Sequence, residues 1–212
     1  MKAMVMAAGR GERMRPLTDS KPKPLLEARG KPLIAHHLES LAAAGFGEVV
    51  INLSWLGEQI REYLGDGRSF GLSIEYSPEP EPLEVAGGIV QAIDLLSERF
   101  VVVNADVYTD YDFARLRAVE SDAHIVLVAN PEQHPLGDFV LEDGLISNAD
   151  SPRHTYSGIG CFRRDFFTGL ERGKRALAPM LREAAEQGRV TGEFYSGQWH
   201  DIGTVARLEA LG

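Results

Sequence analysis

The chain has 212 residues, 44% of them hydrophobic and 25% charged, which is the composition of a globular protein with a sizeable core. Its formal net charge of −9 disfavours nucleic acid as a partner, so any phosphate must be bound by locally concentrated positive charge or a metal. No apolar stretch approaches the roughly 20 residues of a membrane-spanning helix, and no export signal is visible. The single Cys161 cannot form an internal disulfide. We therefore expect a cytoplasmic protein without membrane association.

The first predicted element is a short apolar strand over 3–7, followed by a loop that contains Gly9 and Gly11. Glycines directly after a buried strand leave backbone N–H groups free to face an anion. Basic side chains are concentrated in the same segment: Arg10, Arg13, Arg15, Lys21, Lys23, Arg29 and Lys31. A solvated basic loop is the usual meaning of such a run, but the strand and the glycines before it favour a site for a polyphosphorylated ligand.

Two well-known glycine loops do not fit this segment. A dinucleotide-binding loop needs G-x-G-x-x-G at the start of a helix, but Met14 takes the place of the third glycine and Pro16 interrupts the first helical turns. A P-loop needs G-x-x-x-x-G-K-[ST], and the chain contains no such string. The loop therefore belongs to another class of phosphate-binding protein.

Further along the chain, predicted strands alternate with predicted helices. Short β-branched runs predict buried strands over 49–53, 101–103 and 125–128. Apolar residues three and four positions apart predict helices over 33–44, 56–64 and 86–96. This order predicts an α/β fold with a largely parallel sheet and helices on both faces. Ligands of such sheets bind beyond the carboxyl ends of the strands, where the glycine loop would lie.

After about residue 130 the pattern changes to short alternating segments separated by glycine and proline. Segments such as 139–142 and 156–162 predict hairpins laid over the sheet. A last longer helix is predicted near 178–187, followed by a strand-like pair at 194–195. No internal repeat, low-complexity tract or linker interrupts the chain, so no domain boundary is expected there.

Two aspartates are candidate metal ligands. Asp106 directly follows the apolar run 101–105, so it should stand at the carboxyl end of a strand and face the glycine loop. Asp201 lies near the C-terminus, just before Gly203 and Thr204. Each alone is more often an N-cap or a turn residue than a ligand, and that alternative stays open. Mg²⁺, however, is normally held by one or two carboxylates together with phosphate oxygens.

Five motifs in one order resemble those of the sugar-1-phosphate nucleotidyltransferase family, and the resemblance runs from end to end. They occupy residues 6–13, 21–24, 83–88, 103–106 and 199–204. The resemblance implies a Rossmann-like, three-layer fold with a mixed, mostly parallel sheet and a small β-rich sugar-binding lobe. It also implies a single domain over 1–212, with a nucleotide-binding part in 1–130 and a sugar-binding, closing part in 131–212.

The resemblance further assigns a role to each matching residue. Arg13 and Lys23 would gather the triphosphate and stabilise charge at the α-phosphorus, and Asp106 and Asp201 would bind Mg²⁺ as the cofactor. Nucleotide binding would involve Ala8, Gly9, Gly11, Arg13, Lys23, Glu79, Glu84, Gly87 and Gly88. Sugar binding would involve Asn104, Asp138 and Tyr156, although a buried hydrogen-bonding role is an equal alternative for each of these three.

Some positions depart from the family pattern. Glu12 replaces a threonine and Ala105 replaces a glycine. Asp150-Ser151-Pro152 stands where many relatives have Glu-Lys-Pro, so the lysine that contacts a phosphate in those relatives has no counterpart at this position.

Several other reactive side chains are expected to have structural roles. His36, His37 and His124 show no metal-ligand spacing and are predicted to lie at the surface or to pack. Cys161 lies among apolar residues and is predicted to be a buried side chain rather than a nucleophile.

The resemblance implies an enzyme that forms a UDP-sugar and pyrophosphate from UTP and a sugar 1-phosphate. N-acetylmuramate 1-phosphate, an intermediate of peptidoglycan recycling, is the preferred sugar. Two alternatives stay open: a guanylyl- or thymidylyltransferase for mannose or glucose 1-phosphate, and a non-catalytic sensor of sugar nucleotides. No partner beyond the substrates is expected, and the oligomeric state, monomer or dimer, is left open.

Overall fold

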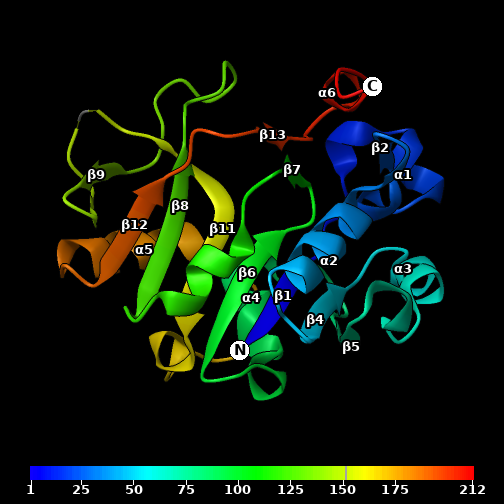
Figure 1. Ribbon diagram of the computed structural model, residues 1–212, viewed down its shortest axis with the longest axis horizontal. Coiled ribbons are helices and arrows are strands. Elements are labelled where there is room, and N and C mark those ends of the chain that lie inside the picture. The colour runs from blue at the N-terminus through cyan, green and yellow to red at the C-terminus, as the bar shows by residue number, and fades with distance from the viewer. Residues whose placement is uncertain (151) are drawn as a thin grey trace.

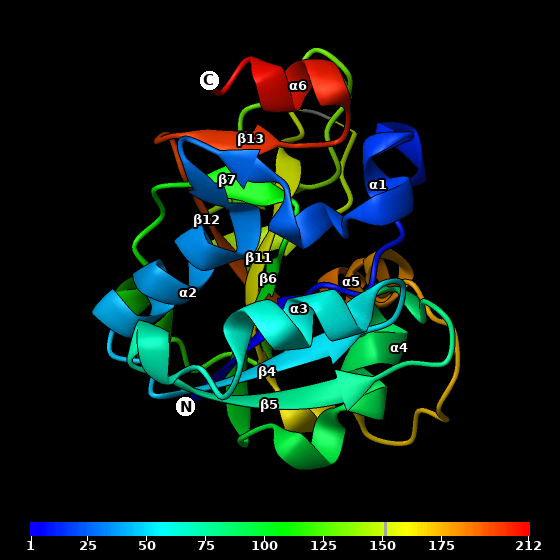
Figure 2. The same ribbon diagram turned by 90° about the vertical axis from the view of Figure 1, so that its right-hand side faces the viewer.

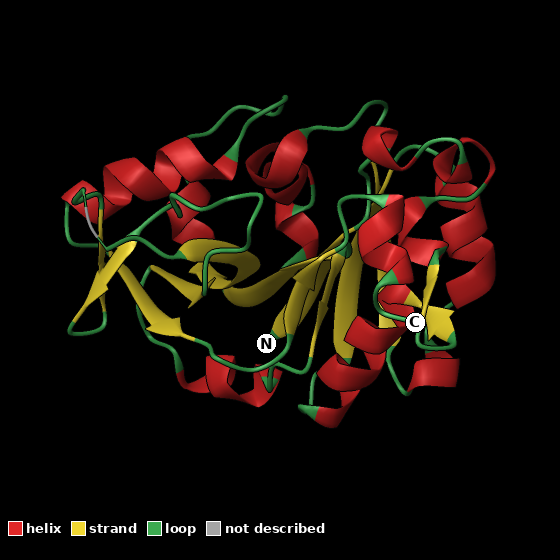
Figure 3. Ribbon diagram, turned by 90° about the horizontal axis from the view of Figure 1, so that it is seen from above, coloured by secondary structure: helices red, strands yellow, loops and turns green. Residues whose placement is uncertain are grey.

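A computed structural model describes residues 1–150 and 152–212, and its centre is a mixed sheet with helices on both faces (Figures 1 and 3). Over these residues the sheet has nine strands, in the spatial order β5 (Ser73–Pro78), β4 (Glu48–Leu53), β1 (Lys2–Met6), β6 (Arg99–Asn104), β11 (Thr155–Arg163), β8 (Ala123–Val128), β12 (Val190–Phe194), β10 (Leu145–Ser147) and β9 (Val140–Glu142). The pairs β5–β4, β4–β1, β1–β6 and β8–β12 are parallel, whereas β11 is antiparallel to both of its neighbours. The predicted three-layer, mostly parallel α/β fold is confirmed.

The helices connect and cover these strands. They are α1 (Leu17–Ser20), α2 (Leu33–Ala43), α3 (Gly57–Leu64), α4 (Glu84–Gln91), α5 (Leu177–Glu186) and α6 (Val205–Glu209). Two small sheets lie outside the main one, β2 (Glu27–Ala28) with β3 (Lys31–Pro32) and β7 (Val107–Thr109) with β13 (Trp199–Asp201). Figure 2 shows β7 and β13 side by side beneath α6, so the C-terminal segment returns to the residues that follow β6. No helix of the described residues is long and apolar enough to cross a membrane.

Most predicted elements agree with the structure, but the segment 156–162, predicted as part of a hairpin laid over the sheet, is β11, a central strand that pairs with β6 and β8. Gly158 and Gly160 interrupt its apolar run, which is why the sequence pattern indicated a hairpin. The helix predicted over 86–96 is α4, which ends at Gln91 and is followed by a 3₁₀ turn over Ile93–Leu95. Strand β5 was not predicted, because at the edge of the sheet only Ile74 and Ser77 of its residues are buried, so it lacks the apolar run of a central strand. The hairpin β9–β10 continues the main sheet through β12 instead of forming a sheet of its own.

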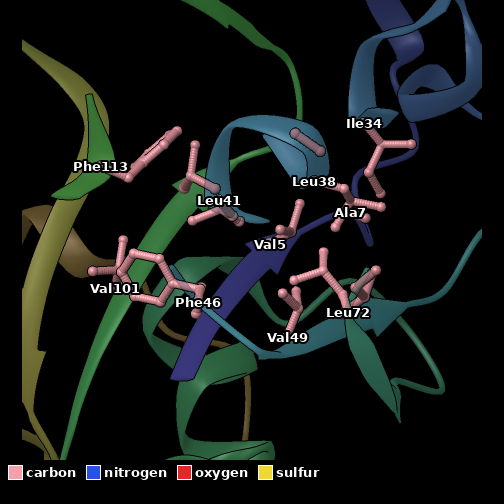
Figure 4. Packing of buried hydrophobic residues seen from close by; sticks show 14 of the residues in the cluster. Val5, Ala7, Ile34, Leu38, Leu41, Phe46, Val49, Leu72, Val101 and Phe113 are labelled. Atoms are coloured by element: carbon pink, nitrogen blue, oxygen red, sulfur yellow. The ribbon is translucent and has the colours of Figure 1, made fainter. Parts of the chain in front are cut away.

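The core consists of two main hydrophobic clusters, one on each face of the sheet. Because side chains alternate along a strand, β1 sends Val5 into the cluster beneath α2 and Met4 into the cluster beneath α4. Figure 4 shows Val5 close to Leu38 and Leu41 of α2. Strand β1 is therefore buried from both sides, and this rigid strand ends directly at the glycine loop.

The structure confirms the packing roles predicted for His36, His124 and Cys161. His36 Nε2 lies 2.8 Å from the carbonyl oxygen of Ala28, and His124 Nδ1 lies 2.8 Å from Thr191 Oγ1. Cys161 is 1% exposed, and burial raises the pKa of its thiol to about 11. A thiol with such a pKa is protonated at neutral pH, so it is a poor nucleophile.

His37 on α2 is buried, and it makes the stability of the fold depend on pH. Its side chain is 2% exposed, and Nε2 has no hydrogen-bond partner among the described residues. Burial lowers the pKa of His37 to about 4, because the charged imidazolium would lose its solvation. Between about pH 6.5 and pH 4 the unfolded chain binds a proton that the folded chain does not, so stability falls as the pH falls through this range.

We predict that His37 accounts for about 2 kcal/mol of the unfolding free energy lost between pH 7 and pH 5. Urea unfolding at both pH values measures this loss, and His37→Leu, which cannot titrate, should lose that much less than the wild type. His200 is exposed, so His200→Asn should keep the wild-type pH dependence. Equal losses in His37→Leu and wild type would contradict the prediction.

Candidate active site

A pocket of about 300 Å³ lies at the carboxyl ends of β1, β4 and β6. Its lining includes six of the residues predicted to bind nucleotide or metal, namely Ala8, Gly9, Lys23, Glu79, Glu84 and Asp106. Asn52 and Asn104, which follow the apolar parts of β4 and β6, line it as well. The pocket therefore lies where a parallel sheet is expected to bind its ligand.

One wall of this pocket is held by a chain of hydrogen bonds through Glu79. The N–H of Ala7 donates to Asn52 Oδ1 (2.6 Å), and Asn52 Nδ2 donates to Glu79 Oε1 (2.7 Å). The N–H of Leu83 donates to Glu79 Oε2 (2.9 Å). Burial raises the pKa of Glu79, while the bonds from Asn52 and Leu83 oppose the rise. Both oxygens thus connect the end of β1 to the segment that starts α4.

We predict that Glu79→Gln lowers the free energy of unfolding by about 1–3 kcal/mol. An amide presents N–H groups to Asn52 Nδ2 or to the N–H of Leu83, which are both donors, and Asn52 cannot turn because Ala7 uses its oxygen. Urea unfolding measures the loss. Glu81→Gln is the matched control, because Glu81 is exposed. Equal stability of the two variants would show that the wall does not depend on the carboxylate.

Lys23 and Asp106 form an ion pair in the pocket. Lys23 Nζ lies 2.7 Å from Asp106 Oδ2, and the two side chains are 8% and 38% exposed. Gly11 makes room for this lysine: its φ is +67°, and a Cβ there would lie 3.1 Å from Lys23 Cβ and 3.0 Å from Thr18 Cγ2. The glycine loop therefore folds around Lys23, whose ammonium group pairs with the predicted metal ligand Asp106.

A second pocket of about 250 Å³ adjoins the first. Asn104 and Asp106 line both pockets, so these two residues stand where the pockets meet. The remaining lining residues are Val107, Pro131, Gln133, His134, Thr155, Tyr156, Ser157, Gly158, Trp199 and Asp201. Two ligands can therefore be placed side by side with the Asp106 carboxylate between them.

Asp201 lies in the second pocket and is bound by a basic side chain from α6. Arg207 Nη1 donates to Asp201 Oδ2 (2.7 Å). A Cβ added to Gly203 would lie 3.2 Å from Asp201 Oδ2 and 3.3 Å from Arg13 Nη1, so the Arg13 guanidinium lies close to Asp201. Arg13 itself lines neither pocket. The N-cap of α6 is Thr204, so the N-cap alternative for Asp201 is wrong.

The donor set at this junction fits a magnesium ion. Asp106 and Asp201 both line the second pocket, and carboxylate oxygens are the ligands that Mg²⁺ prefers. Within 1–150 and 152–212, no group of three or more His, Cys, Asp or Glu side chains could hold a metal ion. Oxygens of a bound phosphate or water would have to complete the coordination of the ion.

Gly87 and Gly88 lie behind the pocket and do not line it. A Cβ on Gly87 would lie 2.3 Å from the carbonyl oxygen of Gly173, and one on Gly88 would lie 2.7 Å from Glu79 Oε1. Both glycines are thus required by close packing on the start of α4. Their predicted contact with the nucleotide remains a prediction.

Two predicted sugar-binding residues have different surroundings. Asp138 does not line either pocket; its carboxylate accepts from His134 Nε2 (3.1 Å) and from the N–H of Tyr156 (2.9 Å). Tyr156 lines the second pocket, but its hydroxyl is buried without a hydrogen-bond partner among the described residues, and burial raises its pKa. Asp150 faces Arg153 at 3.4 Å, while Ser151 of the departing motif lies outside the described residues.

Sequence reasoning missed several residues that line the pockets, among them Asn52, Trp199 and Lys174. Asn52 lies at the carboxyl end of β4, directly after an apolar run, so a signal like that of Asp106 could have identified it. Trp199 lines the second pocket and donates from Nε1 to the carbonyl oxygen of Ser157 (2.9 Å). Lys174 lines the first pocket from a segment far along the chain, and no sequence signal pointed to it.

Comparisons with known proteins find relatives over nearly the whole length of the chain. Residues 2–139 match the family model described as nucleotidyl transferase. The chain is 51% identical to N-acetylmuramate alpha-1-phosphate uridylyltransferase of Neisseria meningitidis, over 99% of this chain and 96% of the relative. It is 31% identical to mannose-1-phosphate guanylyltransferase of Mycobacterium tuberculosis, over 95% of this chain and 61% of the relative. The fold is similar to that of a Bacillus anthracis protein assigned as a glucose-1-phosphate thymidylyltransferase, with a TM-score of 0.89, 21% identity and coverage of 100% and 93%.

Proposed function

Because the chain belongs to the nucleotidyl transferase family, we propose that it forms UDP-N-acetylmuramate and pyrophosphate from UTP and N-acetylmuramate α-1-phosphate. The identity of 51% over nearly the whole length of both chains supports the choice of substrates. The observation that carries the proposal is the pair of adjoining pockets, which share Asn104 and Asp106. A transferase needs two substrates in contact, and this junction offers that contact.

In this proposal UTP occupies the first pocket and the sugar 1-phosphate the second. The backbone of Ala8 and Gly9 faces the phosphates of UTP, and the Lys23 ammonium contacts the α-phosphate. Asn104 and Tyr156 border the sugar. Asp106 and Asp201 would hold Mg²⁺, which when bound neutralises phosphate charge and orients the phosphates.

The reaction needs no nucleophile or general base from the protein. An oxygen of the sugar phosphate is already anionic near neutral pH, and it attacks the α-phosphorus while pyrophosphate leaves. The protein therefore contributes by positioning the two phosphates and by stabilising the charge that develops, which together lower such barriers by several kcal/mol. Lys23 does this at the junction of the pockets, and Arg13 does so from beside Asp201.

A guanylyltransferase is the second candidate, because a relative of that activity is 31% identical over most of this chain. Uracil and guanine share one recognition edge, in which a carbonyl group lies next to a ring N–H; we call it the keto edge. Cytosine and adenine present an amino group next to a bare ring nitrogen instead. The nucleotide therefore has to be established by direct comparison of the triphosphates.

The direct test supplies each pair of nucleoside triphosphate and sugar 1-phosphate and measures pyrophosphate release. We expect release with UTP and N-acetylmuramate 1-phosphate, and a much lower rate with glucose or mannose 1-phosphate. Turnover of GTP with mannose 1-phosphate would favour the second candidate. Absence of release with every UTP pair would remove the uridylyltransferase assignment.

The same proposal places the protein in the cytoplasm and in peptidoglycan recycling. The single buried cysteine is consistent with a reducing compartment. We keep monomer and dimer as alternatives for the assembly. Size-exclusion chromatography with light scattering distinguishes them.

A further inference from the structure

A segment from the second half of the chain lies against the nucleotide pocket, and we call residues 173–175 the strap. The N–H of Gly87 donates to the carbonyl oxygen of Arg175 (3.1 Å), and the N–H of Arg175 donates to the carbonyl oxygen of Leu83 (2.9 Å). The strap approaches so closely that a Cβ on Gly87 would lie 2.3 Å from the carbonyl oxygen of Gly173. Backbone hydrogen bonds and close packing therefore fix the strap on the start of α4.

The strap brings Lys174 to the pocket. Lys174 is among the lining residues, together with Glu84 at the start of α4. Lys174 Nζ lies 3.7 Å from Glu84 Oε1, and the side chains are 63% and 44% exposed. An exposed ion pair at this distance contributes little stability. A bound ligand can therefore replace either partner of the pair at little cost in free energy.

The proposed function places the phosphates at Ala8, Gly9 and Lys23, which leaves the part of the first pocket at the start of α4, where this pair lies, for the base. Its neighbours are Leu83 and Gly87, whereas the pair of Lys23 and Asp106 serves the phosphates. Lys174 is a donor only, and the Glu84 carboxylate is an acceptor only. Side by side, they offer one donor next to one acceptor, which is the complement of a keto edge.

We propose that Lys174 and Glu84 select the base of the nucleotide, with Lys174 donating to the carbonyl oxygen and Glu84 accepting from the adjacent ring N–H. This inference rests on the proposed function for its ligand. The amino bases reverse the order of donor and acceptor, so cytosine and adenine face Lys174 with an N–H group and Glu84 with a lone pair. The pair thus disfavours CTP and ATP as well as favouring UTP.

The test measures equilibrium dissociation constants of UTP and CTP by calorimetry, with magnesium and without sugar phosphate. Lys174→Met keeps the length of the side chain and removes the donor. We expect it to weaken UTP binding about tenfold and CTP binding much less, so that the preference for UTP falls by nearly the same factor. Glu84→Gln should also reduce the preference, because its amide can serve both kinds of base.

The matched control is Arg172→Met, which removes a cation just before the strap. Arg172 pairs with Asp94 at 3.7 Å and does not line the pocket, so this variant should bind both nucleotides as the wild type does. If Lys174→Met weakened the binding of UTP and CTP equally, the lysine would only attract phosphate by its charge, and the inference would be overturned. Unchanged binding of both would overturn it too.

Failure of the proposed function gives a different result. If the wild type releases pyrophosphate with GTP and not with UTP, the uridylyltransferase assignment fails. Base selection by Lys174 and Glu84 then still predicts that Lys174→Met lowers the preference for GTP over ATP, since guanine carries the same keto edge. An unchanged ratio for that pair would overturn the strap inference as well.

Discussion

Replacing Lys23 with methionine is expected to lower kcat by about 100- to 1000-fold and to leave the protein folded. Lys23 Nζ lies 2.7 Å from Asp106 Oδ2, where the two pockets meet, so in the proposed reaction its charge would act on the reacting phosphates. Methionine fills a similar space in the glycine loop but cannot stabilise negative charge. Asp106 is 38% exposed, so water can solvate the carboxylate that the lysine leaves, and the loss of stability should be small.

Steady-state kinetics of pyrophosphate release measure this effect, and urea unfolding checks the fold. Lys21→Met is the matched control, because Lys21 lies two residues away and its ammonium pairs at the surface with Glu27, at 3.5 Å. It should keep kcat within about twofold of the wild type. A kcat near the wild-type value in Lys23→Met would show that the charge at the α-phosphorus is stabilised from elsewhere.

Local patterns in the sequence identified β1, β4, β6 and β8 because these strands are buried from both sides, whereas β11, equally buried, was predicted as a hairpin segment because glycines interrupt it. The apolar runs of β1, β4, β6 and β8 are recognisable without any partner. Strand β5 lies at the sheet edge with only Ile74 and Ser77 buried, and β7 and β13 are three residues each, so their pairing depends on tertiary contacts. Short elements of that kind carry too little local signal to be predicted.

The candidate site divides in the same way. Asp106 and the loop of Gly9 could be predicted because they follow buried strands, and the structure brings both to one pocket. Glu79 could be identified by resemblance. Its hydrogen bonds from Asn52 and Leu83 could not be predicted, since they depend on which donors the fold places around the carboxylate. Lys174 reaches the pocket only because Gly87 admits the strap, and no spacing in the sequence encodes that contact.

The substitution Asp106→Asn tests whether Asp106 serves catalysis or only nucleotide binding. Asparagine keeps the shape of the side chain but removes the charge that pairs with Lys23 and that would bind Mg²⁺. We expect turnover to fall at least about 100-fold, because an interaction at the reacting phosphates contributes mainly in the transition state. The unfolding free energy should change little, since the side chain is partly exposed.

Two measurements on this variant separate the hypotheses. Pyrophosphate release reports the chemistry, and calorimetric titration with UTP in the presence and absence of magnesium reports binding. Asp112→Asn is the control: Asp112 caps the 3₁₀ turn Phe113–Ala118 by accepting from the N–H of Ala114, and asparagine can accept the same bond. A residue that serves only binding stabilises no transition state, so its substitution changes the affinity for the nucleotide alone. A residue that serves catalysis also supports turnover, and a binding measurement does not detect the loss of turnover. Normal nucleotide binding together with unchanged turnover would therefore remove Asp106 from the catalytic site, and with it the argument that the two pockets meet at a metal.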